Sequence, residues 1–171
     1  MSDFESLFAD KIVKDSIEPI YLRPAAILVR KGNPKHIQGF KDLSRPNTKV
    51  LVTHGAGQVG MWEDIAGRTG NIQLTKSFRK NIAMYAPNTG TAKKAWETDS
   101  SYDAWLVFNI WGVSNPGIGQ IIPIEPELVI YRDAGVALTQ HSLKNPEAKS
   151  FVTFLSSPQG HAIFKQFGWN K

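Results

Sequence analysis

The stretch VLVTHGAGQVGMW, residues Val50–Trp62, decides how this chain folds, because an apolar run passes directly into a turn with three glycines. The residues Lys49–Thr53 are typical of a short strand that is buried on both faces. Glycine allows the tight turn by which such a strand enters a helix, and Gln58–Arg68 has helical apolar spacing. The stretch therefore predicts a strand, a turn and a helix of an α/β fold.

The elements expected on both sides of this stretch alternate in type. Strands are expected at Pro24–Lys31, Lys49–Thr53, Ile82–Tyr85 and Ala104–Phe108, and helices at Ile37–Leu43, Gln58–Arg68, Leu74–Asn81 and Gly90–Glu97. This order is typical of parallel strands that are joined by helical crossovers. We therefore predict an α/β fold with a mostly parallel sheet and helices on both of its faces.

The last third of the chain has a different pattern. Leu128–Tyr131 and Gly135–Thr139 are expected to be extended. In Asn145–Glu147 and in Ser157–Gln159, a capping side chain precedes a proline, which predicts two helix starts. The apolar residues between positions 148 and 167 recur at helical spacing, so we predict that their aromatic side chains belong to the core.

The composition limits the class of protein. The 171 residues, with 42% hydrophobic content, are enough for a substantial core, and no apolar run is long enough to span a membrane. The first residues lack the basic and then apolar order of a signal peptide, so we expect no signal segment in this chain. Because the chain has no cysteine, disulfides, thiolate catalysis and cysteine zinc sites are excluded.

The net charge of +5 is concentrated in residues 19–60. No run of five like charges occurs, which argues against a nucleic-acid partner. Two explanations for the basic stretch stay open at this point, a solvated basic face and a small anionic ligand.

No arrangement of residues indicates catalysis. The four histidines are scattered, and the HExxH, GxSxG and P-loop motifs are missing. We therefore predict that the protein is not an enzyme and uses neither a metal nor a cofactor. His54 alone ends a predicted strand beside glycines, where α/β sheets bind ligands, and its alternative role is that of a surface residue.

The glycine turn is the first candidate binding site. Its residues Gly57, Gln58, Val59 and Gly60 precede a helix whose first N–H groups lack partners and carry partial positive charge. Anions bind at such helix starts. The GxGxxG pattern of Gly55–Gly60 also fits a dinucleotide site, but Thr75–Ser77 stand where the acidic residue of that site is expected. A tight turn without a ligand is the third possibility.

A second helix start, at Ala86–Thr91, offers Asn88, Thr89 and Gly90 as further contacts. Because the carboxyl ends of parallel strands meet at one edge of a sheet, both starts are expected to converge on one anion. Asn88 could instead be a plain N-cap. Arg23 and Arg132 flank the α/β region, and each could bind the anion or form a structural salt bridge.

Several segments resemble one family of proteins. Tyr21–Pro34, Asp103–Val107 and Asn145–Trp169 are similar to periplasmic solute-binding proteins of the molybdate and sulfate type, and most similar to the accessory colonisation factor C group. The same likeness is found in Gly55–Gln58 with Trp62–Asp64, in Arg79–Ile82, in Ala86–Gly90 and in Ile124–Pro126 with Tyr131–Asp133.

The resemblance implies a type II periplasmic binding fold, in which an anion such as sulfate, molybdate or a small carboxylate lies between two lobes. It also implies a periplasmic location and delivery of the ligand to an ABC permease. Residues 32–125 would form the second lobe, 21–31 and 126–139 the crossover segments, and 1–20 with 140–171 a first lobe whose opening βαβ part is missing. The alternative from another class is a cytosolic effector-sensing or nucleotide-binding α/β domain.

The family's helix termini map onto Gly57–Gly60 and Asn88–Gly90, and its strand end at the cleft maps onto Phe108 and Asn109. Molybdate-binding members commonly have a tyrosine where Phe108 stands, so Asn109 would replace that contact. Trp105 and Trp111 could either wall the cleft or belong to the core.

An incomplete first lobe would leave apolar side chains uncovered. Phe4, Leu7 and Phe8, together with the helices across Phe151–Phe167, would have no sheet to pack against. We therefore expect the chain to self-associate.

Overall fold

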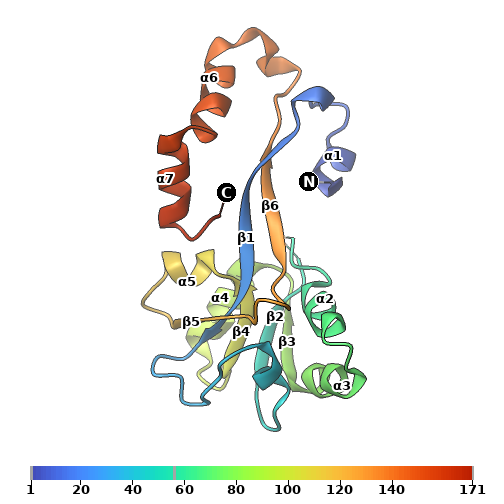
Figure 1. Ribbon diagram of the computed structural model, residues 1–171, viewed down its shortest axis with the longest axis vertical. Helices are drawn as coiled ribbons and strands as arrows, with labels where there is room; N and C mark the ends of the chain where they lie inside the picture. The colour runs from blue at the N-terminus through green and yellow to red at the C-terminus, as the bar shows by residue number, and fades with distance from the viewer. Residues whose placement is uncertain (1, 56, 171) are drawn as a thin grey trace. The chain divides into compact units, whose positions relative to one another are not determined.

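The computed structural model describes residues 2–55 and 57–170 (Figure 1). Met1, Ala56 and Lys171, which some predicted segments include, lie outside the described residues. The chain divides into two compact units, one made of Met1–Arg23 and Arg132–Lys171 and the other of Pro24–Tyr131. The lobe and crossover boundaries that the resemblance implies stay a prediction.

The central sheet has the strand order β3-β2-β4-β1-β5, and β6 pairs with β1 outside this path. The strands are β1 (Glu18–Val29), β2 (Val50–Thr53), β3 (Ile82–Ala86), β4 (Ala104–Phe108), β5 (Gln120–Pro123) and β6 (Tyr131–Val136). β2 is parallel to β3 and to β4, whereas β1 is antiparallel to β4 and to β5. The α/β class is thus confirmed. The strands β3, β2, β4 and β5 run in one direction, and β1, which lies between β4 and β5, runs in the opposite direction.

Most predicted elements of the Pro24–Tyr131 unit exist, and all but Ala104–Phe108 have shifted ends. The prediction that Leu128–Tyr131 is extended is wrong for Leu128, which lies in a turn, and β6 starts only at Tyr131. The helices of this unit are α2 (Met61–Arg68), α3 (Ile72–Asn81), α4 (Thr89–Thr98) and α5 (Ile110–Ser114), and the helix expected at Ile37–Leu43 is a 3-10 turn, η2 (Phe40–Ser44). α2 starts three residues later than predicted because Gly57 and Gly60 have φ angles of +76° and +71°, which break the helical conformation.

Two hydrophobic clusters lie on the two faces of this sheet, so the prediction of helices on both faces is confirmed. Ile27 and Val29 of β1 pack with buried side chains of η2, α2 and α3, while Leu28 packs with α4 on the opposite face. Figure 1 shows α2 and α3 together on one side of the sheet. Trp105 is fully buried and its ring centroid lies 6.4 Å from that of Trp96, so Trp105 belongs to the core.

The other unit contains α1 (Ser2–Leu7), η1 (Lys14–Ser16), η3 (His141–Lys144), α6 (Pro146–Leu155) and α7 (Pro158–Gln166). Both predicted caps are confirmed. The Asn145 side chain accepts a hydrogen bond from the N–H of Glu147 at 3.0 Å, and the Ser157 hydroxyl accepts one from Gly160 at 3.1 Å. Helix capping is a local interaction, which explains why the sequence predicts it well.

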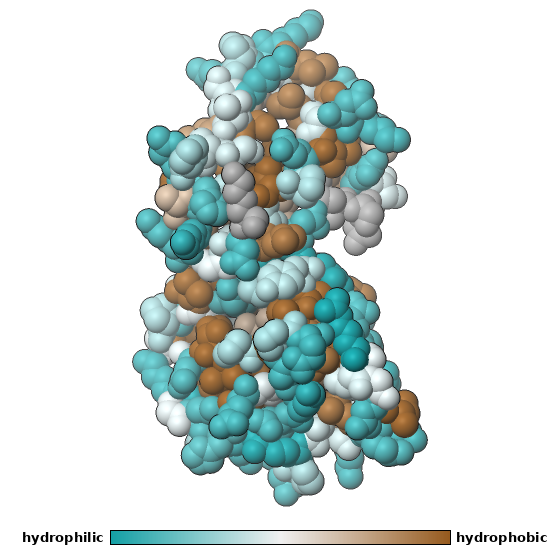
Figure 2. Space-filling view, in the orientation of Figure 1, coloured by the Kyte–Doolittle hydropathy of each residue, from teal (hydrophilic) through white to brown (hydrophobic). Residues whose placement is uncertain are grey.

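The prediction that the aromatic side chains of α6 and α7 are core residues is wrong for most of them in this chain. Phe151, Phe154 and Phe167 are 59%, 43% and 48% exposed, and Ile163 is 46% exposed. Figure 2 shows apolar surface over this unit. An apolar stripe on a helix indicates that this face packs against another element, but the stripe does not show whether the chain supplies that element. Among the aromatic rings described in this unit, only that of Tyr21, in β1, is buried, and its centroid lies 3.9 Å from that of Phe164.

Candidate functional site

The candidate site lies where β2 and β3 end, within the Pro24–Tyr131 unit. The loops that follow these two strands are in contact, because the N–H of His54 donates to the carbonyl oxygen of Ala86 at 2.7 Å. Gly55 approaches the next residue of the second loop so closely that an added Cβ would lie 2.3 Å from the Pro87 carbonyl oxygen. Glycine at this position is therefore required for the two predicted helix starts to meet.

A buried hydrogen bond joins the two helix starts. Gln58 is 3% exposed and Thr89 is 6% exposed, and the Nε2 of Gln58 donates to the Oγ1 of Thr89 at 3.1 Å. The hydroxyl oxygen of Thr89 thus accepts a hydrogen bond from Gln58, and the hydroxyl hydrogen can still be donated to another acceptor, such as a ligand. The Oε1 of Gln58 is buried and has no hydrogen-bond partner among the described residues. Gln58 therefore positions Thr89 at the first turn of α4.

The two helix starts differ in charge. The first turn of α2 carries Glu63 and Asp64, whereas the first turn of α4 carries no acidic residue. Acidic side chains compensate the partial positive charge of a helix N-terminus. An anion is therefore attracted more strongly to the start of α4 than to the start of α2. The glycine turn before α2, which the sequence predicts as the first candidate, is thus the less favourable of the two starts for an anion, and its acidic pair is visible in the sequence.

Asn88 is the N-cap of α4, as one of the two interpretations of the sequence predicts. Its side chain accepts a hydrogen bond from the N–H of Thr91 at 2.8 Å. Asn88 and Gly90 are exposed next to the buried Thr89, and Val59 is 59% exposed on the other loop. Of the N–H groups in the first turn of α4, that of Thr91 is therefore occupied by the cap, and those of Thr89 and Gly90 are the ones that a ligand could use.

Asn109 follows β4 and so lies at the same edge of the sheet as the ends of β2 and β3. Its N–H donates to the carbonyl oxygen of Pro24 at 3.0 Å. With Pro24, Ile121 and Tyr131 it lines a cavity of about 310 Å³. The neighbouring Phe108 is fully buried in the core, so the position where molybdate-binding members have a tyrosine is filled by a core ring.

The two predicted arginines belong to the other unit, and their role as ligand contacts stays a prediction. The guanidinium carbon of Arg23 lies 5.4 Å from the ring centroid of Trp169. Burial lowers the pKa of Arg23, and the nearby charge of Asp133 partly opposes this shift. These contacts fit the structural alternative for Arg23. Arg132 is half-buried near the start of β6.

His54 is exposed at the end of β2. Within residues 2–55 and 57–170, no group of three or more histidine, aspartate or glutamate side chains is placed to hold a metal ion. In the same part of the chain, none of the helices is both long and apolar enough to cross a membrane.

The sequence profile of a family described as bacterial extracellular solute-binding protein matches residues 1–170. The chain belongs to this family. No curated protein is similar enough to the chain to count as a match. Members of the family bind solutes and do not form a class of enzymes, which agrees with the prediction from the sequence.

Solved structures of other solute-binding proteins share the fold. PEB3 with bound L-phospholactate is 38% identical to this chain, with a TM-score of 0.89 over 99% of this chain and 74% of that one; another PEB3 structure is from Campylobacter jejuni. The sulfate-binding protein SubI from Mycobacterium tuberculosis is 19% identical, with a TM-score of 0.76 over 98% and 65%. The periplasmic molybdate-binding protein of Azotobacter vinelandii is 11% identical, with a TM-score of 0.72 over 99% and 73%.

These comparisons confirm the resemblance to periplasmic solute-binding proteins of the molybdate and sulfate type. The molybdate and sulfate proteins share the periplasmic binding fold with this chain. PEB3 is similar enough in sequence to be a relative within the family. The closer likeness to the accessory colonisation factor C group stays a prediction.

Proposed function

We propose that this solute-binding protein holds a small anion at the start of α4 and delivers it to an ABC permease from the periplasm. The observation that carries the proposal is the buried Gln58–Thr89 hydrogen bond at 3.1 Å, which fixes a hydroxyl beside the first N–H groups of a helix without acidic residues in its first turn. A site made of neutral donors suits an anion that has lost its water shell.

The ligand class that we favour is a small carboxylate that also carries a phosphate group. This choice is supported by PEB3, the 38% identical relative with bound L-phospholactate. Phosphate and carboxylate groups both accept hydrogen bonds from N–H and hydroxyl donors. Sulfate and molybdate are the competing ligands, because proteins that bind them share the fold.

The family, and not the site, supports the proposed periplasmic location and the proposed permease. A bacterial extracellular solute-binding protein works outside the cytoplasm, and such proteins deliver ligands to membrane permeases. The rival proposal of a cytosolic effector-sensing domain would be favoured if the protein were found in the cytoplasmic fraction. Cell fractionation, with a cytoplasmic enzyme as the marker, separates the two.

Titration calorimetry tests the site. We expect L-phospholactate to bind and Thr89→Val, which keeps the shape but removes the hydroxyl, to weaken binding at least about tenfold, since a hydrogen bond to a charged group contributes about 1.5–3 kcal/mol. The control is Thr98→Val at the other end of α4, where the hydroxyl donates to the carbonyl oxygen of Lys94. Equal affinities of the Thr89 and Thr98 variants would refute the site.

Asn88→Ala tests the same site but also removes a helix cap, so its effect on folding must be measured in parallel. Gly57→Val is a poor test, because Gly57 has a φ angle of +76°. A Cβ is strained in this conformation, and the variant would change the turn as well as any ligand contact.

A further inference from the structure

A second cavity lies at the opposite ends of β2 and β3 from the candidate site. Its volume is about 500 Å³, and its lining comes from the segment before β2, the end of α3 and the start of β3. The lining residues are Ser44, Pro46, Asn47, Thr48, Lys49, Ser77, Lys80, Asn81 and Ala83. Because β2 and β3 are parallel, this cavity and the loops of the candidate site are separated by the length of the strands, roughly 13 Å for four residues.

The loop on one side of this cavity is held in place by hydrogen bonds to its backbone. The Nδ2 of Asn81 donates to the carbonyl oxygens of Leu43 and Arg45 at 2.8 and 2.7 Å. The Nζ of Lys35 donates to the carbonyl oxygen of Asn47 at 3.0 Å, and Asn47 has a φ angle of +61°. A cavity wall that is already ordered loses little entropy when a ligand binds.

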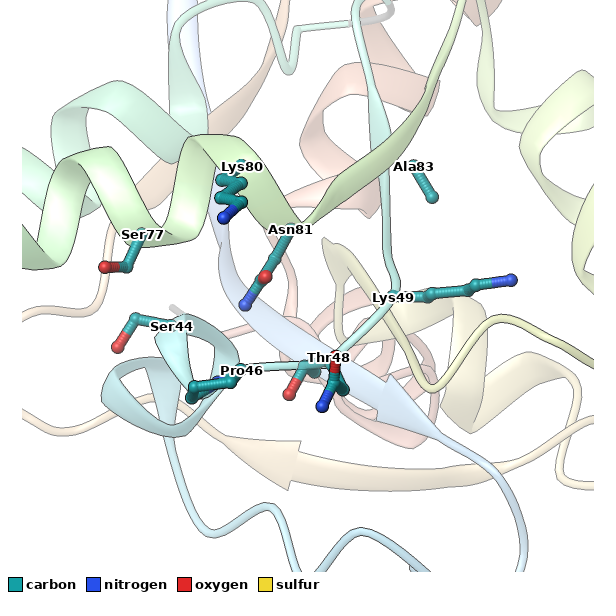
Figure 3. Close-up of a pocket in the computed structure, with 9 residues that line it drawn as sticks. Ser44, Pro46, Thr48, Lys49, Ser77, Lys80, Asn81 and Ala83 are labelled. Atoms are coloured by element: carbon teal, nitrogen blue, oxygen red, sulfur yellow. The ribbon is translucent and has the colours of Figure 1, made fainter.

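Several polar side chains of the lining, among them those of Thr48, Ser77 and Lys80, have no hydrogen bond or ion pair within the described part of the chain. Thr48 is only 4% exposed, and its hydroxyl oxygen is not among the fully buried atoms that lack a partner. Ser77 and Lys80 are exposed, so their hydroxyl and ammonium groups are accessible to a ligand. Figure 3 shows Lys80 and Asn81 extending from the end of α3 toward the segment of Pro46 and Thr48, whereas Lys49 points away. Hydroxyl, amide and ammonium donors therefore border the cavity.

The charges of the lining favour an anion. Two lysines and no acidic residue line the cavity. Asp103 borders the lining, since it lies 3.7 Å from Lys35 and accepts the N–H of Lys49 at 2.8 Å. The carboxylate of Asp103 is thus already engaged by Lys35 and by the backbone of the lining residue Lys49. A lysine next to hydroxyl and amide donors is a recurrent arrangement for binding phosphate and carboxylate groups.

We propose that this cavity is a second anion site, which takes a small molecule that carries a phosphate or a carboxylate group. Lys80 supplies the charge, and Thr48 and Ser77 supply hydrogen bonds. The site lies away from the proposed transport ligand, so its occupancy does not require the proposed function. Lys80 also complements the partial negative charge at the end of α3, a role that affects stability but does not create a saturable site.

Two-dimensional ¹H–¹⁵N NMR at low salt tests this proposal, with inorganic phosphate and then acetate as probes. We expect saturable shifts of the amide signals of Thr48, Lys49 and Asn81. Lys80→Met should weaken phosphate binding at this cavity at least tenfold. Thr48→Val, which keeps the shape of a buried side chain, should weaken it several-fold while the spectrum elsewhere is unchanged. Acetate shifts at the same signals would extend the site to carboxylates.

The matched control is Lys76→Met, one turn earlier on the same helix, because Lys76 is exposed and does not line the cavity. Equal weakening by the two lysine substitutions would mean that phosphate senses only the general positive field, and the proposal would be wrong. Shifts that grow linearly without saturation would refute it as well. Shifts confined to Thr89 and its neighbours would refute this site while supporting the proposed function.

Discussion

The two units of this molecule bury apolar side chains to different extents. In the Pro24–Tyr131 unit, Trp96, Trp105 and Phe78 are fully buried against a sheet that is covered on both faces. In the unit that contains α6 and α7, Phe151 and Phe167 remain about half exposed. Amphipathic helices of similar length therefore bury their apolar faces in one unit and leave them exposed in the other.

The largest expected effect on the free energy of unfolding comes from removing a buried side chain from the core of the Pro24–Tyr131 unit. Trp105→Ala should lower the free energy of unfolding by about 3–5 kcal/mol, because it removes a fully buried ring. Phe151→Ala, the matched change on a 59% exposed ring, should cost less than about 1 kcal/mol. Urea denaturation followed by tryptophan fluorescence for Phe151→Ala, and by circular dichroism for both variants, gives the two values. Equal losses would show that the Phe151 side chain is buried in solution, which would contradict the contrast between the two units.

An intermediate effect concerns self-association, which the exposed apolar side chains lead us to propose. Phe4, Phe8, Phe151 and Phe167 are all at least 40% exposed. We expect the chain to associate in sedimentation velocity experiments, and the pair Phe151→Ser and Phe167→Ser to weaken association about tenfold, equal to 1.4 kcal/mol. The control is Tyr85→Ser in the other unit, where Tyr85 is 47% exposed. A monomer at all concentrations would contradict the proposal.

The smallest expected effect is a pH dependence that reports on the Pro24–Tyr131 unit. Hydrogen bonds from the side chain and the backbone N–H of Ser101 lower the pKa of Asp99. The backbone nitrogen of Ser101 lies 2.8 Å from the Oδ1 of Asp99. A carboxyl group with a lowered pKa in the folded state stabilises the fold above its unfolded pKa, and this contribution is lost as the pH falls through the folded pKa. Asp99→Asn should therefore be less stable than the parent at neutral pH, and the difference should shrink in acid.

Urea denaturation at a series of pH values measures this difference. Ser101→Ala removes one of the two hydrogen bonds, so in that background the pH dependence from Asp99 should be smaller. A difference that stays constant from neutral to strongly acidic pH would show that Asp99 is not stabilised as an anion.

Much of the fold could be predicted because its signals are local. The strand Ala104–Phe108 has the predicted bounds, and the caps Asn145 and Ser157 act on N–H groups two and three residues away. The convergence of the glycine turn with Ala86–Thr91 was also predictable, since parallel strands place their carboxyl ends at one edge. The direction of β1 could not be predicted, because the order of elements along the chain does not specify the direction in which each strand runs in the sheet.

The sequence by itself determined where strands and helices form, which chain segments carry glycine for close approach, and to which family the chain is similar. These properties depend on neighbours within a few positions or on a pattern of many residues. Only the tertiary structure decided that Gln58 hydrogen-bonds to Thr89, 31 positions away, that Phe108 is a core ring, and that Phe151 is left uncovered. Such contacts join side chains that are distant in the chain, and their energies depend on distances and burial that exist only in the folded molecule.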